Sequence, residues 1–329
     1  MTCLANLSPY GSPICAQTIV EMPGESYQGP LPELTKSQLD LAAELRWHVD
    51  ALAAKVGERN LVRRPARLIQ AANYVDKCFR AVGLEPKRQT YRVGRGECDN
   101  LECEFPGGAL AEEIVVVGAH YDSVSGCPGA NDNGSGAAAL LSLARLLRDA
   151  GCNRTIRLVA FANEEQPYFQ TGSMGSYVYA RRCQSRGETI TAMISLETIG
   201  YYSDRPGSQR YPAPLSRYYP TTGNFVAFVG DTRNAPLVKQ CVAAFRQSAK
   251  FPSEGGALPR HLAGVGWSDH WSFWQHGYPA VMVTDTALFR YPHYHRASDT
   301  PDKIDYERMA LVVEGLAAVI HDLSGAAER

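Results

Sequence analysis

The middle of the chain alternates short apolar runs, rich in β-branched residues, with segments of helical periodicity. The apolar runs have the length of buried strands and comprise 114–118, 156–162, 192–196, 225–229 and 280–283. The helical segments comprise about 134–149, 172–184, 235–248 and 269–276, with a last one at about 306–323. Because alternating strands and helices build parallel sheets covered on both faces, this order predicts a single three-layer α/β/α domain with a mixed, mostly parallel central sheet.

Two further helices are expected ahead of this alternation. The first starts at a capping-box pattern, Ser37 to Asp40, and its apolar spacing continues to about Val56. The second starts near Pro65, which suits a first helical turn, and ends at Gly83, which suits a C-terminal cap.

Composition assigns the remaining segments. Short apolar runs at 91–93 and 101–105 are expected to form an antiparallel edge of the sheet. Segments 203–222 and 252–266 are rich in Pro and Gly, so they are expected as long loops that contain neither a regular helix nor a central strand.

Length and composition indicate one large domain. A chain of 329 residues with 45% hydrophobic residues can bury a substantial core as a single open α/β sheet. Residues 1–34 carry Pro, Gly and Ser without periodicity and predict an extended N-terminal arm, which leaves 35–329 for the folded domain.

Charge and cysteine usage narrow the classes of partner and location. The formal net charge of -1 gives no basic surplus for a nucleic-acid backbone or an anionic membrane surface. No apolar run approaches a membrane span, and the first 25 residues lack the basic and apolar regions of a signal peptide. These two observations lead to the expectation of a cytoplasmic location. The nine cysteines include no CxxC pair and are expected mainly as reduced thiols. The oligomeric state is not indicated.

Residues of the types that bind metals follow several of the predicted strands. They comprise His120 and Asp122 after the strand at 114, Glu164 and Glu165 after the strand at 156, Glu197 after the strand at 192, and His295 beyond the strand at 280. Asp132 lies in GANDNGSG, immediately before a predicted helix. Because the carboxyl ends of parallel strands meet at one edge of an open sheet, these side chains are expected to converge there.

The chemistry of this set favours zinc. Two imidazoles and several carboxylates at one edge would repel without a cation, and this donor combination suits Zn²⁺. Asp122 could accept the free N–H of the His120 ring, although an ordinary turn Asp explains it equally well. Glu164 and Glu165 could divide the roles of base and ligand, the alternative for such a pair being a solvated acidic turn.

An ordered series of motifs resembles the zinc exopeptidases that include bacterial leucyl aminopeptidases, aminopeptidase Y and the glutaminyl cyclases. The resemblance covers roughly residues 60–323, and its motifs are GAHYDS (118–123), GANDNGSG (129–136), VAFANEE (159–165), GS (175–176), SLETIGYY (195–202), SDHWSF (268–273) and HRASDT (295–300). It implies two zinc ions per chain. His120 would bind one ion and Asp132 would bridge both, with Glu165 and His295 completing the sites and Glu164 acting as base.

Several positions leave alternatives open. Most relatives carry Asp where this chain has Glu197, whose longer side chain reaches a metal only if its backbone sits slightly farther back. Cys127 is expected as a loop thiol rather than a ligand, and His295 is preferred over His293 because it aligns with the family's segment. Asp269 and His270 are expected to line the site or to support Glu164.

Four residues in and before the predicted helix at 269–276 have structural interpretations. Ser268 is expected to cap the helix at 269–276. Trp271, Phe273 and Trp274 are expected in the core.

The resemblance implies an aminopeptidase that acts on peptides or amino-acid amides, with 35–329 as its catalytic domain. The tyrosine-rich segment from Tyr201 to Tyr219, including Tyr218, is interpreted as a lid that selects an apolar first residue. One alternative is a mono-zinc glutaminyl cyclase of the same fold. A second is a non-catalytic binding domain.

Overall fold

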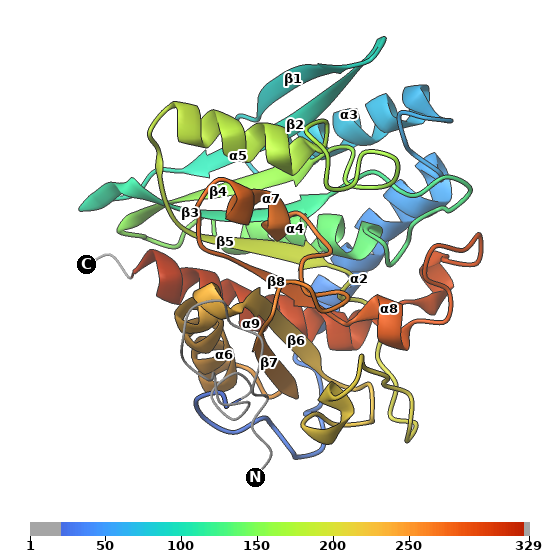
Figure 1. The fold of residues 1–329 in the computed structure, drawn as a ribbon, viewed down its shortest axis with the longest axis vertical. Coiled ribbons are helices and arrows are strands. Elements are labelled where there is room, and N and C mark those ends of the chain that lie inside the picture. Colours follow the sequence, from blue (N-terminus) through green and yellow to red (C-terminus); the bar gives the residue numbers. More distant parts are fainter. Residues whose placement is uncertain (1–20, 326–329) are drawn as a thin grey trace.

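The computed structural model describes residues 21–325, which form one eight-stranded sheet with the strand order β1-β2-β4-β3-β5-β8-β6-β7 (Figure 1). The strands are β1 (Lys87–Val93), β2 (Gly96–Phe105), β3 (Leu110–His120), β4 (Arg154–Phe161), β5 (Thr189–Glu197), β6 (Val226–Asp231), β7 (Ser253–Leu258) and β8 (Ala280–Thr284). Four of the seven strand pairings are parallel, and β1 and β2 form an antiparallel edge. The predicted mixed, mostly parallel sheet is therefore confirmed.

Helices cover both faces of this sheet. They are α2 (Lys36–Val49), α3 (Pro65–Ala81), α4 (Gly134–Leu146), α5 (Gly175–Ser185), α6 (Ala235–Ser248), α7 (His270–Gln275), α8 (Ala287–Arg290) and α9 (Tyr306–Ser324). Successive residues of β3 alternate between two apolar clusters, because side chains along a strand point to opposite faces. Val115 and Val117 pack in the cluster that holds α2, α4 and α9, whereas Val116 packs with Phe273 of α7. Figure 1 shows α5 and α7 together on one face, which completes the three layers.

The N-terminal helices match the predicted extents, but the first capping box does not. Thr35 caps α2, with its side chain accepting from Gln38 N–H and the Gln38 side chain returning to Thr35 N–H. The prediction of Ser37 as the cap is wrong because the helix starts at Lys36, one residue earlier. After Val49 the chain continues to Val56 with π-helical hydrogen bonding, so the expected end near Val56 is correct.

Segment 252–266, expected as a long loop, contains a strand. Residues Ser253–Leu258 form β7, which pairs in parallel with β6 at the outer edge of the sheet. An edge strand hydrogen-bonds on one side only, so it tolerates the two glycines that argued against a central strand. Segment 203–222 contains only one short 3-10 turn, Leu215–Arg217.

The described part of the predicted N-terminal arm lies along α6 and β7. Residues 21–34 form no helix or strand, and residues 1–20 of that prediction lie outside the described part of the chain. The Arg246 side chain donates to the carbonyls of Pro23 and Gly24, and Ser26 accepts from Ser253 N–H. Within residues 21–325, no helix combines the length and apolar character that a bilayer crossing requires.

Candidate metal centre

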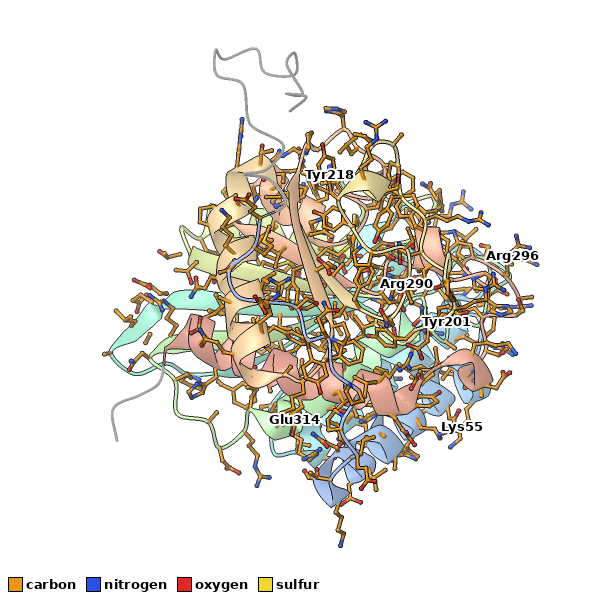
Figure 2. All side chains as sticks on the ribbon, turned by 90° about the horizontal axis from the view of Figure 1, so that it is seen from below. Lys55, Tyr201, Tyr218, Arg290, Arg296 and Glu314 are labelled. Carbon is orange, nitrogen blue, oxygen red and sulfur yellow. The ribbon has the colours of Figure 1, made fainter. Side chains whose placement is uncertain are left out.

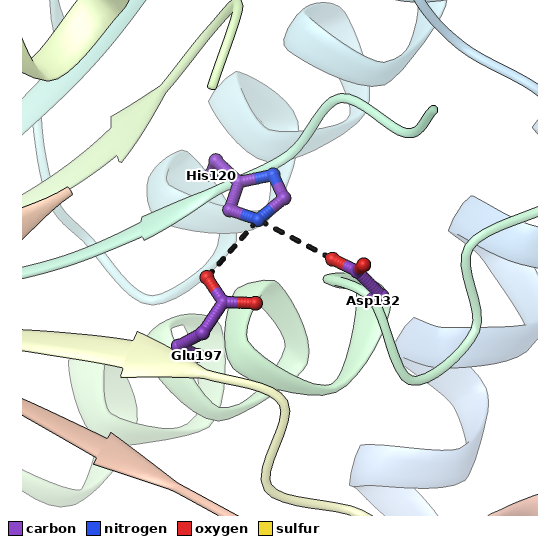
Figure 3. A group of neighbouring side chains, drawn as sticks. All are labelled: His120, Asp132 and Glu197. Carbon is purple, nitrogen blue, oxygen red and sulfur yellow. Dashed lines mark ion pairs between the residues drawn. The ribbon is translucent and has the colours of Figure 1, made fainter. Parts of the chain in front are cut away.

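His120 is the last residue of β3, and its buried ring faces carboxylates from two other elements (Figure 3). Its Nε2 atom lies 3.2 Å from Glu197 Oε2 and 3.5 Å from Asp132 Oδ1. Neither ring nitrogen has a hydrogen-bond partner among the described residues. Polar atoms buried without partners are costly, so this group of three donors fits a bound cation.

A second donor group shares Asp132 with the first. His295 Nε2 lies 3.0 Å from Asp132 Oδ2 and 3.4 Å from Glu165 Oε2. In each group the donor atoms lie within 4.8 Å of one another. The two carboxylate oxygens of Asp132 thus face two different sets of donors, and the predicted ligands come together as two adjacent groups.

Asp132 lies in the loop between β3 and α4, and the buried Asp299 carboxylate holds this loop in place. The Asp299 carboxylate accepts from Asn131 N–H at 2.8 Å and from Asp132 N–H at 3.2 Å. The hydroxyl of Tyr291 donates to the same carboxylate at 2.7 Å, and the Asp132–Asn133 peptide bond is cis. The sequence interpretation missed Asp299, although it lies in the HRASDT motif four residues after His295.

Glu164 and Glu165 form the turn after β4, and Asp122 holds this turn against His120. The two oxygens of Asp122 accept from the backbone N–H groups of Glu164 and Glu165, each at 3.2 Å. Asp122 Oδ1 also lies 3.4 Å from His120 Nδ1. The preceding Asn163 has φ of 56°, in the left-handed region that residues other than glycine adopt rarely and that recurs at functional sites. Asp122 therefore connects the imidazole to the acidic pair.

Glu197 ends β5, and its carboxylate reaches the first donor group. Ser268 donates to Glu197 Oε2 at 2.7 Å, and Ser195 lies 2.8 Å from the same serine hydroxyl. The prediction of Ser268 as a helix cap is wrong, because Asp269 occupies the position before α7 and the Ser268 hydroxyl donates to Glu197 instead.

The electrostatics of the site also fit a cation. Burial raises the pKa of Glu164 well above its usual value, and burial together with Asp132 does the same for Glu165. Burial alone would lower the pKa of His120, but Glu164 and Glu197 raise it well above its usual value. Among the described residues, no Lys or Arg forms an ion pair with any of these four carboxylates. Divalent metal ions would supply the missing positive charge.

Neighbouring candidates occupy different positions. His293 contacts Ser298 instead of the donor groups, at 2.9 Å. His270 Nε2 lies 2.8 Å from the Val265 carbonyl, and its Nδ1 has no hydrogen-bond partner within the described chain, so the expected hydrogen bond to Glu164 is wrong. Both Asp269 oxygens are buried without a hydrogen-bond partner in the described chain.

Cys127 and two of the three aromatic residues at 271–274 have the structural roles expected of them. The Cys127 thiol lies 2.9 Å from the Arg296 carbonyl and belongs to neither donor group, and burial raises its pKa to about 12. Phe273 and Trp274 are buried as expected, whereas Trp271 is partly exposed.

A largely apolar cavity of about 840 Å³, its open mouth included, adjoins the donor groups. Glu197 and Tyr294 line it on the side of the site, and the Tyr294 ring stacks on His295 at 3.9 Å between centroids. From the proposed lid, Tyr211 and Tyr219 line the cavity, but Tyr218 does not. Figure 2 shows Tyr218 near the outside of the molecule, and 44% of it is exposed. Its expected part in a lid over the cavity stays a prediction.

Comparison with known proteins gives a consistent classification. A model of peptidase family M28 matches residues 100–320. "Uncharacterized protein YfbL" of Escherichia coli (strain K12) is 38% identical over 264 residues, which cover 78% of this chain and 80% of that protein. "Probable leucine aminopeptidase" of Arthroderma otae is 29% identical over 71% of this chain, which spans only 59% of that relative's length.

Two solved structures share the fold at low identity. BSAP, a zinc aminopeptidase from Bacillus subtilis, superposes with a TM-score of 0.68 at 15% identity, covering 87% of this chain and 98% of that one. Fimbriiglobus ruber glutaminyl cyclase superposes with a TM-score of 0.63 at 22% identity, covering 90% and 98%.

The fold and the site define a hydrolase of the metallopeptidase class. An α/β/α domain carries two donor groups of imidazole and carboxylate at one edge of its sheet, and a peptidase family matches most of its sequence. The chain belongs to peptidase family M28. The predicted resemblance and the prediction of a peptide hydrolase are therefore confirmed.

Proposed function

We propose that the chain is an aminopeptidase with two zinc ions and a glutamate general base. The observation that carries the proposal is the shared position of Asp132, whose two oxygens face separate donor groups. One ion would be held by His120, Asp132 and Glu197, the other by Asp132, Glu165 and His295. Imidazole nitrogen and carboxylate oxygen are donors that suit Zn²⁺. When bound, zinc would supply Lewis-acid polarisation of a peptide carbonyl and would lower the pKa of a water molecule.

Glu164 is the residue left to move protons. Its Oε2 lies 3.7 Å from His120 Nε2, next to the donor groups, yet it belongs to neither. In the proposed reaction, Glu164 takes a proton from the attacking water and gives it to the leaving amine, so one carboxylate acts first as base and then as acid. Asp122 holds the backbone of Glu164 and faces the His120 ring, which positions base and ligand together.

The adjoining cavity is the proposed site for the side chain of the substrate's first residue. Its lining is mostly apolar and includes Glu197 beside the donor groups, so a peptide whose first carbonyl lies at these groups can place a side chain in the cavity. We propose peptides and amino-acid amides as substrates, in line with the names of the curated relatives.

Two other functions make different predictions. A glutaminyl cyclase would bind one zinc ion and cyclise an N-terminal glutamine. The second donor group around His295 favours the two-zinc aminopeptidase, since a mono-zinc enzyme needs only one such group. A non-catalytic binding domain would show no turnover at all.

Metal analysis combined with turnover of aminoacyl 4-nitroanilides tests the proposal. We expect two zinc ions per chain and hydrolysis that a chelator abolishes. Glu164→Gln should keep both ions and lose roughly 10²- to 10⁴-fold in kcat, the usual contribution of a general base. Glu112→Gln, at the opposite and exposed end of β3, is the matched control and should retain full activity.

Three outcomes would contradict the proposal. One zinc ion per chain together with cyclisation of glutaminyl substrates would indicate the cyclase. Zinc binding without any turnover would indicate a binding domain. Unchanged hydrolysis by Glu164→Gln would remove Glu164 as the base.

A further inference from the structure

The cavity beside the metal site contains one carboxylate that the proposed mechanism does not use. Glu254 on β7 lines the cavity, as do Glu197 and Tyr219. Side chains alternate along the strand. Ser253 and Gly255, which are two residues apart, face α6. Ser253 Oγ lies 3.2 Å from Arg246 Nε, and a Cβ at position 255 would meet Val242. Glu254 therefore points to the opposite face, into the cavity.

The Glu254 carboxylate is half-buried and forms no ion pair within residues 21–325. Among the described residues, no hydrogen bond or ion pair engages it. The opposing charge that acts on it is Arg246, whose guanidinium is used in hydrogen bonds to the backbone carbonyls of Pro23, Gly24 and Ser253. Burial accordingly raises the pKa of Glu254. A carboxylate partly removed from water is stabilised by a cation that enters with a ligand.

The walls next to Glu254 suit an alkyl chain. Tyr211 and Tyr219 stack with 5.7 Å between ring centroids. Their hydroxyls are already used, because Tyr211 donates to the Pro220 carbonyl at 2.6 Å and Tyr219 to the Gly255 carbonyl at 2.8 Å. The rings therefore offer apolar surface to a ligand. A long side chain with a charged end can bury its stem against such surface.

We infer that Glu254 is a specificity-determining residue that selects substrates whose first residue is Lys or Arg. The aliphatic stem would lie along Tyr211 and Tyr219, and the ammonium or guanidinium group would pair with Glu254. This inference rests on the proposed aminopeptidase function and replaces an apolar first residue by a cationic one. Glu254 touches no reacting atom in this scheme, so it affects the choice of substrate and leaves the hydrolytic groups unchanged.

The test compares 4-nitroanilides of Lys, Arg, Leu and norleucine, which has the straight alkyl stem of Lys without the amine. For the zinc-loaded wild-type protein we expect kcat/KM for Lys at least about 10-fold above that for norleucine. Glu254→Gln should lower kcat/KM for Lys and Arg by about 10- to 100-fold and keep norleucine within about 3-fold of wild type. Glu112→Gln, which exchanges the same groups far from the cavity, should leave every ratio unchanged.

The possible failures are distinguishable. Hydrolysis of Leu and norleucine with no preference for Lys in the wild-type protein would overturn the inference while the aminopeptidase function stands, and this comparison needs no folded variant. A Lys preference that persists in Glu254→Gln would overturn the assignment to Glu254. Absence of hydrolysis for all four anilides would refute the proposed function, and the inference with it.

Discussion

Arg59 is the largest fully buried polar side chain of the described structure, and its replacement by Met gives a demanding test of how the metal-site loop is held. The guanidinium donates to backbone carbonyls of the loop that joins His120 to Asp132, among them Tyr121 at 2.6 Å and Gly129 at 2.9 Å. It also donates to the Pro128 carbonyl. Arg59 thus holds this loop through main-chain contacts.

The cost of Arg59→Met follows from which carbonyls lose their only donor. Gly129 also accepts from Gly134 N–H, whereas no other donor within the described chain reaches the carbonyls of Tyr121 and Pro128. Each buried unsatisfied carbonyl costs about 1–3 kcal/mol, so the pair costs roughly 2–6 kcal/mol. Burial lowers the pKa of Arg59, which means that removing its charge recovers part of this cost. We expect a net loss of about 2–4 kcal/mol in the free energy of unfolding.

Urea denaturation with a chelator present measures this loss, because bound zinc would stabilise the native state and mask it. Arg145→Met is the matched control: it removes the same group from the exposed face of α4, where Arg145 pairs with Glu44, and should cost less than about 1 kcal/mol. A loss for Arg59→Met below about 1 kcal/mol, or equal to that of the control, would refute the reasoning.

Three further predictions concern side chains around the site. Asp122→Asn removes the carboxylate that faces His120 and should weaken zinc binding by about 10- to 100-fold in chelator competition, whereas unchanged affinity would exclude this positioning role. Ser268→Ala removes the donor to Glu197 and should weaken zinc binding about 2- to 10-fold in the same assay, and wild-type affinity would contradict that. Burial lowers the pKa of His270 from 6.5 to about 4, so the unfolded chain takes up this proton first. The contribution of neutral His270 to stability is present above pH 6.5 and is lost as the pH falls to about 4. In His270→Gln, the free energy of unfolding should therefore depend less on pH across this window than in the wild-type protein. Equal pH dependence in the two proteins would refute this prediction.

The strands and their order of appearance could be predicted because their residues carry the signal themselves. The apolar run 114–118 is buried on both faces, which requires continuous β-branched and aliphatic sequence. The edge strand β7 could not be predicted in this way. Its residues Gly255 and Gly256 are selected by close neighbours, since a Cβ at position 256 would lie 2.9 Å from the Tyr219 hydroxyl. That contact depends on a segment more than 30 residues away along the chain.

The ligand set could be proposed from the sequence because strand ends place side chains at a common edge, but the residues that hold them could not. Asp299 supports Asp132 through backbone N–H groups, and such contacts leave no pattern in side-chain spacing. The same limit applies to Arg59, whose acceptors are all carbonyls. Local propensity also misplaced Ser268, because a serine before a helix has the composition of a cap whether or not its hydroxyl is used elsewhere.

The departure at Glu197 has a structural counterpart in this chain. Ser195 and Glu197 are two residues apart on β5, so their side chains lie on the same face of the strand. A hydroxyl has one hydrogen, and because Ser268 donates its hydrogen to Glu197, Ser195 must donate to Ser268. This chain of two serines ends on the carboxylate and restrains a side chain with one more rotatable bond than Asp. The longer residue therefore reaches the proposed metal site with its extra freedom already limited, which is why a Glu at this position is compatible with a complete donor group.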